Sequence, residues 1–283
     1  MIVENLKIFL QNVWKNSLIV NTILETQSQF NIVFIQELPW SEIHRIPSSS
    51  DCEGKTLMGT THHPNWLSFA RIPSERSDSP RVIAYINIHL SSFHFLLCKD
   101  IINHRNIILI SFINNHICYY IMNVYSDSSH SALKYLKNTE VNINNIFLMT
   151  GDFNIRDSLW NLSFPFNSSI SDNLIIIADL FNLSLLIPIN PCLTRYSNTA
   201  GEANSVINLM FLHYGSTKLD QHLFILIVVC PPTMLLSPSI SLLMKKLFAL
   251  WNYRFLKEAS RKPPLSKKSF QTSKTWTCLT LLT

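Results

Sequence analysis

One short stretch, Thr150 to Asn154, combines residue types and spacing that suit phosphate chemistry. It reads Thr-Gly-Asp-Phe-Asn and follows the apolar run Ile146 to Met149, which predicts a buried strand. A carboxylate at Asp152 and a carboxamide at Asn154, two residues apart at a strand end, fall on the same side of the chain. The carboxylate can orient or deprotonate a water, and the amide can hold a phosphoryl oxygen. An Asx turn that only shapes the backbone is the structural alternative.

Four other segments have strand character and carry polar residues that could join Asp152. Their apolar runs are typical of strands buried on at least one face. They are Leu6 to Asn12, ending in Gln-Asn; Asn31 to Glu37, ending in Gln-Glu; Tyr119 to Tyr125, ending in Asn-Val-Tyr; and Ser205 to Phe211, which contains Asn208.

With these motifs in this order, the chain resembles the endonuclease/exonuclease/phosphatase superfamily, which has the DNase I-like fold. It is most similar to the endonuclease domain of LINE-type retrotransposons. The resemblance covers about Leu6 to His222. It implies an α/β fold, a four-layered sandwich of two packed mixed β-sheets flanked by helices and incomplete at the C-terminal end. The activity it implies is Mg²⁺-dependent cleavage of a DNA phosphodiester.

The resemblance also implies a role for each candidate site residue. Mg²⁺ suits such a site because it takes oxygen ligands and keeps several waters, with Mn²⁺ as the alternative ion. Without the resemblance, Glu37 would be an ordinary solvated acid, and a tyrosine or arginine at a strand end would be a core-edge or surface residue. The implied roles are metal binding by Glu37 and Asn12, positioning of the attacking water by Asp152, phosphate contacts by Asn154 and Tyr125, and DNA contacts by Thr194 and Arg195.

Two departures from the family pattern predict an impaired enzyme. In active relatives the position of Asn208 is an aspartate that orients a catalytic histidine, and an asparagine lacks the charge that stabilises an imidazolium. That histidine belongs to a Ser-Asp-His motif, which this chain lacks. The segment Asp220-Gln221-His222 follows Asn208 too closely to replace it, and we expect it in a loop.

The uncharged run Leu223 to Met244 stands where that motif is expected. Its length alone would suit a membrane span, but Pro231, Pro232 and Pro238 argue against one. We favour a frameshift, because Val228 to Ser239 can be encoded so that another frame reads Arg-Leu-Ser-Ser-Asp-His-Ala-Pro-Leu-Thr-Val. On this hypothesis residues 1–222 form the enzyme-like domain and residues 223–283 are a poorly ordered, frameshifted tail.

The remaining segments predict helices and further strands. Asn16 or Ser17 caps a helix to about Gln29. Two more predicted helices are Ser131 to Thr139 and one that Ser171 caps and that ends near Phe181. Pro39 to Pro80 is expected to be a long connection with short ordered pieces. Arg81 to Ile88, Ile107 to Ile113 and Tyr119 to Val124 are expected to be successive strands of one sheet.

Composition restricts the class of protein and its partners. Hydrophobic residues make up 47% and charged residues 14%, which suits a large core, and the net charge of +5 favours a polyanionic partner such as DNA. The six widely spaced cysteines and the absence of a secretory signal indicate an intracellular protein, nuclear if it acts on DNA. No protein partner is indicated, so we expect a monomer. A catalytically dead relic that binds DNA weakly, and a phosphatase or sphingomyelinase-like member of the same fold, are the alternative functions.

Overall fold

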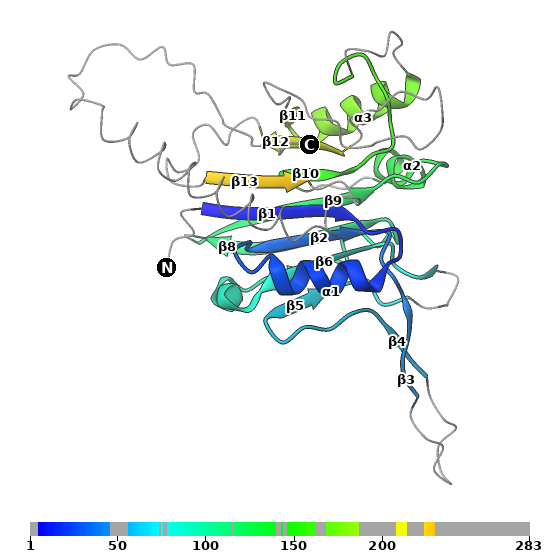
Figure 1. The fold of residues 1–283 in the computed structure, drawn as a ribbon. Coiled ribbons are helices and arrows are strands. Elements are labelled where there is room, and N and C mark those ends of the chain that lie inside the picture. The colour runs from blue at the N-terminus through cyan, green and yellow to red at the C-terminus, as the bar shows by residue number, and fades with distance from the viewer. Residues whose placement is uncertain are drawn as a thin grey trace, which may run out of the picture.

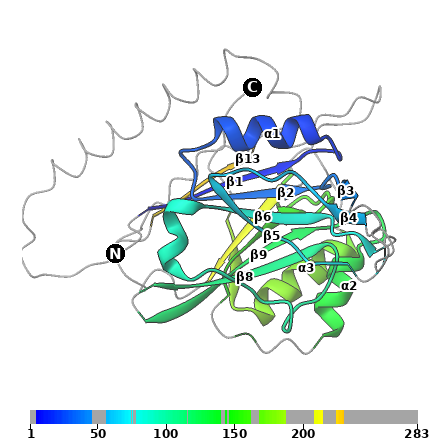
Figure 2. The same ribbon diagram turned by 90° about the horizontal axis from the view of Figure 1, so that it is seen from below.

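Two β-sheets pack face to face in the computed structural model, which describes residues 5–45, 56–73, 75, 78–114, 116–139, 143, 146–161, 168–186, 208–213 and 224–229. Helices lie on the outer faces of the two sheets (Figures 1 and 2). The first sheet has the order β13-β1-β2-β6-β5. Its strands are β1 (Asn5–Asn12), β2 (Ile32–Gln36), β5 (Trp66–Phe69), β6 (Val82–Asn87) and β13 (Phe224–Val229).

The second sheet has the order β11-β12-β10-β9-β8-β7. Both sheets are mixed, because β1 is parallel to β2 and β9 is parallel to β10 while most other neighbours are antiparallel. The strands of the second sheet are β7 (Leu96–Leu97), β8 (Ile107–Asn114), β9 (Ile117–Tyr125), β10 (Ile146–Asp152), β11 (Leu183–Leu185) and β12 (Asn208–His213). A separate hairpin of β3 (Ser41–Arg45) and β4 (Thr56–Gly59) projects from the body (Figure 1).

Three buried apolar clusters account for the layers of the fold. The central cluster joins alternate residues of the two sheets, such as Ile8, Phe34 and Ile121. A second cluster lies under helix α1 (Ser17–Thr26), and a third lies between the second sheet and helices α2 (Ser131–Asn138) and α3 (Ser169–Leu180). Since each sheet buries both faces, its central strands are apolar at nearly every position, as in β2 and β6. The predicted four-layered α/β sandwich is therefore confirmed.

Side-chain caps mark the start of α1 and α3. α1 (Ser17–Thr26) starts after Asn16, whose Oδ1 accepts from the backbone N–H groups of Leu18 and Ile19, as the sequence predicted. α3 (Ser169–Leu180) is capped by Ser168 rather than by Ser171. Ser171 is instead the N3 residue of a reciprocal capping box, in which its hydroxyl accepts from the N–H of Ser168. α2 (Ser131–Asn138) and the 3₁₀ helix η2 (Ile88–Phe93) complete the helical elements in this part of the chain.

One sequence prediction about the sheets was wrong. β6 does not join β8 and β9, because it pairs with β2 and β5 in the first sheet. The 3₁₀ helix after β6 carries the chain across to the other sheet, so closeness in sequence did not produce pairing. The segment Pro39 to Pro80 contains three short ordered pieces, the strands β3, β4 and β5, in agreement with the sequence prediction.

The strand β13 begins within the segment predicted to be a frameshifted tail. It pairs in parallel with β1, from Asn5 opposite Phe224 to Leu10 opposite Val229. The motif Asp220-Gln221-His222 and residues 230–283 lie outside the described residues, so the domain boundary stays a prediction. Within the part of the chain that the structure describes, no helix is long and apolar enough to cross a membrane.

Candidate active site

The predicted site residues lie where strands of both sheets end. In the first sheet Asn12 of β1 is opposite Gln36 of β2, and Glu37 follows at once. In the second sheet Asp152 of β10 is opposite Tyr125 of β9 on one side. The two sheets meet here through a hydrogen bond of 3.1 Å, in which Asn12 Nδ2 donates to Asp152 Oδ2. Residues 140 positions apart in the chain thus form one edge.

Asp152 is held on both of its carboxylate oxygens. Its side chain is buried, with the residue only 3% exposed. Oδ2 accepts from Asn12, and Oδ1 accepts from the backbone N–H of Asn154 at 3.2 Å, which is an Asx turn. Asn154 has a left-handed backbone, with φ of 51°, and its Nδ2 donates to the carbonyl of Ser126 at 2.8 Å. The structural and the functional interpretations of this motif are therefore compatible, because the turn fixes the carboxylate.

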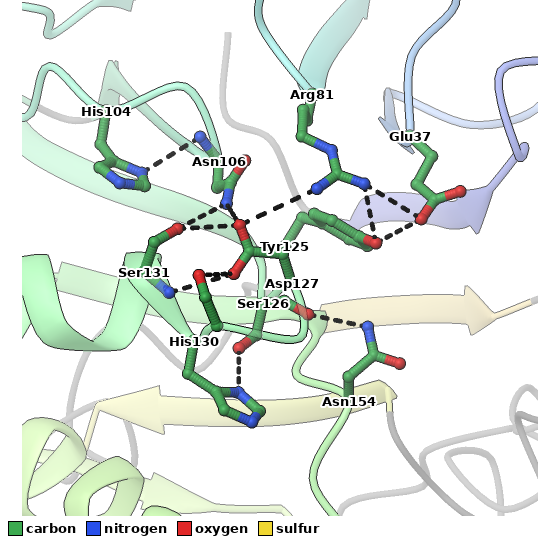
Figure 3. Close-up of polar contacts among 11 residues, drawn as sticks. Glu37, Arg81, His104, Asn106, Tyr125, Ser126, Asp127, His130, Ser131 and Asn154 are labelled. Atoms are coloured by element: carbon green, nitrogen blue, oxygen red, sulfur yellow. Dashed lines mark hydrogen bonds and ion pairs between the residues drawn. The ribbon is translucent and has the colours of Figure 1, made fainter.

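Glu37, Tyr125 and Arg81 form a compact polar group (Figure 3). The Tyr125 hydroxyl donates to Glu37 Oε1, and Arg81 Nη2 donates to the same oxygen at 3.3 Å and to the Tyr125 hydroxyl at 3.1 Å. The guanidinium also lies over the Tyr125 ring, 4.3 Å from its centroid, in a cation–π contact. Burial, and then the hydrogen bond to Glu37, raises the pKa of Tyr125. The phenol therefore stays protonated and remains a donor at neutral pH.

Buried amides fasten the two sheets directly behind this group. Gln36 Nε2 donates to Asn123 Oδ1 and to the backbone carbonyl of Val124, each at 3.0 Å. Gln36 and Asn123 are both fully buried. Glu37 follows Gln36 in the chain, and Tyr125 lies two residues after Asn123. These hydrogen bonds therefore fix the positions of Glu37 and Tyr125 relative to each other.

A network around Asp127 fixes the loop that follows Tyr125 (Figure 3). Asn106 Nδ2, the Ser129 and Ser131 hydroxyls and the Ser131 backbone N–H all donate to the Asp127 carboxylate. Burial by itself would raise the pKa of Asp127, but these hydrogen bonds outweigh it and lower the pKa. The carboxylate therefore stays ionised, and it caps the start of α2.

A serine and a histidine form a second contact in the same loop. The Ser126 hydroxyl lies 2.7 Å from His130 Nδ1, and Ser126 is fully buried. Burial lowers the pKa of His130, so the imidazole tends to be neutral near pH 7. This pair orients the segment whose carbonyl, at Ser126, receives the Asn154 amide.

The structure thus joins the predicted residues in two groups at one edge, Asn12 with Asp152 and Glu37 with Tyr125. Asn208 lies directly opposite Asp152, in the antiparallel register of β10 and β12. Thr194 and Arg195 lie outside the described residues. Arg81 and Asp127 also contribute to the site and were not among the residues predicted from the sequence. Their positions in the sequence could have indicated them, because Arg81 directly precedes a buried strand and Asp127 is two residues after Tyr125.

The donor set at this edge fits Mg²⁺ better than a soft metal. Among the described residues no group of three or more His, Cys, Asp or Glu side chains could hold an ion. Mg²⁺ needs only one or two carboxylates, because waters and substrate phosphates complete its shell. Glu37 supplies a partly exposed carboxylate. Asn12 turns its nitrogen to Asp152, so its oxygen, which accepts from the Trp14 N–H at 3.0 Å, keeps a second lone pair for a ligand.

Comparison with solved structures identifies the fold. The endonuclease domain of TRAS1, a telomere-specific non-LTR retrotransposon, matches with a TM-score of 0.53 and 14% identity over 74% of this chain and 86% of that chain. D. rerio TDP2 complexed with single strand DNA product matches with a TM-score of 0.37 and 12% identity, over 73% of this chain and 82% of that one. A beta hairpin deletion mutant of beta toxin from Staphylococcus aureus matches with a TM-score of 0.38 and 10% identity, over 74% of this chain and 87% of the toxin.

No family model and no curated protein matches the sequence. The match to the TRAS1 domain shows that this chain has the DNase I-like fold of the endonuclease/exonuclease/phosphatase proteins. The resemblance drawn from the sequence is confirmed at the level of the fold.

Proposed function

We propose that this chain is a metal-dependent DNA phosphodiesterase domain of the retrotransposon endonuclease type, impaired in this copy. The hydrogen bond between Asn12 and Asp152 is the observation that carries the proposal. It brings the amide expected at a metal and the carboxylate expected at the attacking water into contact at one edge. Glu37 and Tyr125, which the same function requires, form their own hydrogen bond beside it.

Each of these side chains has a chemical task that its surroundings support. Glu37 and the Asn12 oxygen would hold Mg²⁺, which supplies positive charge against the phosphate when bound. Asp152 is anchored by two donors, so its carboxylate can orient a water without changing rotamer. The protonated Tyr125 hydroxyl can donate to a phosphate oxygen, and the Asn154 amide lies next to Asp152 for the same purpose.

Asn208 is the reason to expect an impaired enzyme. It stands opposite Asp152, at the position where the resemblance requires an aspartate. A neutral amide cannot stabilise a protonated imidazole as a carboxylate does, and the sequence lacks the Ser-Asp-His motif that would supply the imidazole. Residues that act as a catalytic unit are strongly non-additive, so the loss of two leaves little activity.

DNA is the substrate class best supported by the features around the site. The net charge is +5, and the structure whose TM-score carries the fold assignment is a retrotransposon endonuclease domain. Directly after Asn12, the loop presents an exposed Trp14, at 55% exposure, and an exposed Lys15, both with left-handed backbones. Proteins that bind a single strand of nucleic acid typically stack its bases on aromatic rings and hold its phosphates with cations, and this loop presents one residue of each kind.

Nicking of supercoiled plasmid in Mg²⁺ tests the proposal. Three repaired forms are compared with the natural chain: one with the reading frame restored after His222, one with Asn208→Asp, and one with both. We expect measurable nicking only in the double repair, and its loss again on Asp152→Ala. Robust metal-dependent nicking by the natural chain, abolished by Asp152→Ala, would show that the missing dyad is not needed. A double repair that folds and does not nick would count against the nuclease assignment.

A further inference from the structure

We propose that Arg81 acts as a built-in cation that occupies Glu37 in the metal-free protein, and that a divalent cation releases it to contact a DNA phosphate. The metal and the DNA would then bind cooperatively. This inference rests on the proposed function, because it takes Glu37 as the metal ligand. It adds a residue and a coupling that the resemblance does not supply.

The Arg81 guanidinium contacts the carboxylate that the proposed function assigns to the metal. Nη2 lies 3.3 Å from Glu37 Oε1, and the guanidinium carbon lies over the Tyr125 ring, 4.3 Å from its centroid. The partner on its other side is weaker, since Arg81 Nη1 is 3.9 Å from Asp127. Asp127 is already saturated by hydrogen bonds from the Asn106 amide and from two serines. Glu37 is therefore the acid that holds Arg81 most closely.

A metal ion bound to Glu37 would lie close to the positive charge of the Arg81 guanidinium. The carboxylate would join both cations, and repulsion between charges a few ångströms apart is strong near a protein surface. The Arg81 side chain is 21% exposed, so it has a route to solvent, and its long stem can turn without unfolding β6. Tyr125 would keep its place through the β9 and β10 ladder.

The released guanidinium would suit a phosphate. It presents several N–H donors in a fixed fork, and Arg is favoured for phosphate contacts for that reason. Tyr125 and Asn154, the expected phosphate contacts, lie on the same edge (Figure 3). Linkage then requires that DNA strengthen metal binding by the factor by which the metal strengthens DNA binding.

The first measurement is calorimetric titration of the full chain with Mg²⁺ alone. We expect Arg81→Gln to bind Mg²⁺ about fivefold or more tightly than the natural chain, since a competing charge is gone. Arg81→Lys keeps the charge and should stay close to the natural affinity. Arg71→Gln is the matched control, because Arg71 is also half-buried in an ion pair, with Asp78, outside the site. Glu37→Gln should abolish the binding.

The second measurement is the affinity for a short fluorescent DNA duplex, with and without Mg²⁺, over a series of salt concentrations. Mg²⁺ also screens DNA, and Glu37→Gln gives that background. Above it, Arg81→Gln should keep only the gain in DNA affinity that the bound ion itself gives. The natural chain and Arg71→Gln should gain more affinity with Mg²⁺ than Arg81→Gln does, and their log–log dependence of affinity on salt should steepen by about one unit more, the value of one added phosphate contact.

The outcomes distinguish a failure of the inference about Arg81 from a failure of the proposed function. If Glu37→Gln and the natural chain respond alike to Mg²⁺, the proposed metal site is wrong. If Mg²⁺ binds through Glu37 but Arg81→Gln binds it no more tightly, or less tightly, Arg81 only positions Glu37 and the inference is overturned. Tighter Mg²⁺ binding with an unchanged effect of Mg²⁺ on DNA would overturn the phosphate contact. Melting curves confirm that each variant is folded.

Discussion

Gly151→Ala tests whether the close approach of β9 and β10 sets the geometry of the site. Gly151 lies in β10 directly before Asp152, opposite Val124 of β9. A Cβ added at this position would lie 1.8 Å from the Val124 carbonyl oxygen and 2.8 Å from its carbonyl carbon. Cβ atoms essentially never lie closer than 3.0 Å to such atoms. The two strands would therefore have to separate by about 1.2 Å, the difference between 3.0 and 1.8 Å.

The cost can be built from two terms. Forcing an extra methyl group into a packed interior costs about 1–3 kcal/mol. The Val124 carbonyl also accepts from the buried Gln36 amide, and breaking that hydrogen bond would cost about 1–3 kcal/mol more. The sum, about 2–6 kcal/mol, is a large part of the 5–15 kcal/mol that stabilises a typical domain.

Urea denaturation followed by circular dichroism measures this change. We expect the urea concentration at the unfolding midpoint to be much lower for Gly151→Ala, with a similar dependence of the free energy of unfolding on urea, or the variant to be unfolded without urea. Ser68→Ala, at an exposed position of β5, is the control and should change the free energy of unfolding by less than about 0.5 kcal/mol. A loss below about 1 kcal/mol in Gly151→Ala, with Mg²⁺ binding retained, would refute the argument from strand approach.

Two further variants test the surroundings of the site. Asp127→Asn should lower stability at neutral pH. The stabilisation from ionised Asp127 is present above its unfolded pKa of about 3.9 and is lost as pH falls toward the lowered pKa of the folded state. Urea midpoints of variant and natural chain should therefore converge below about pH 4, and a constant difference would contradict this. Trp14→Ala should weaken binding to single-stranded DNA by about 1–3 kcal/mol in a fluorescence titration, with an unchanged melting temperature. Leu18→Ala, an apolar control on α1 that is also exposed, should leave DNA binding unchanged, and equal losses in the two variants would argue against base stacking.

The sequence by itself was sufficient to locate most strands of the two sheets. Their apolar runs are local signals, and a strand such as β2, buried on both faces, is apolar at almost every position. The polar residue at the end of each run was equally visible in the sequence. The resemblance then assigned roles to Asn12, Glu37, Tyr125 and Asp152, so these residues could be chosen before their distances were known.

Sheet membership required the tertiary structure. β6 and β8 look alike in sequence, yet they lie in different sheets, since burial on both faces gives the same composition in either sheet. The cap of α3 was misplaced by three residues for a related reason. Ser168 and Ser171 are the same residue type, and the buried Asp157, which accepts from the Ser168 N–H at 3.0 Å and from the Ser171 hydroxyl, decides their roles.

Only the fold decided which polar side chains meet. The contact of Asn12 with Asp152 joins the ends of strands from opposite sheets, and no spacing in the chain encodes it. Arg81 had no motif at all, because its role comes from lying over Tyr125 and against Glu37, both 44 residues away. Residue type and burial are local and can be seen in the sequence, whereas the pairing of charges across two packed sheets depends on their register and is set when the sheets pack.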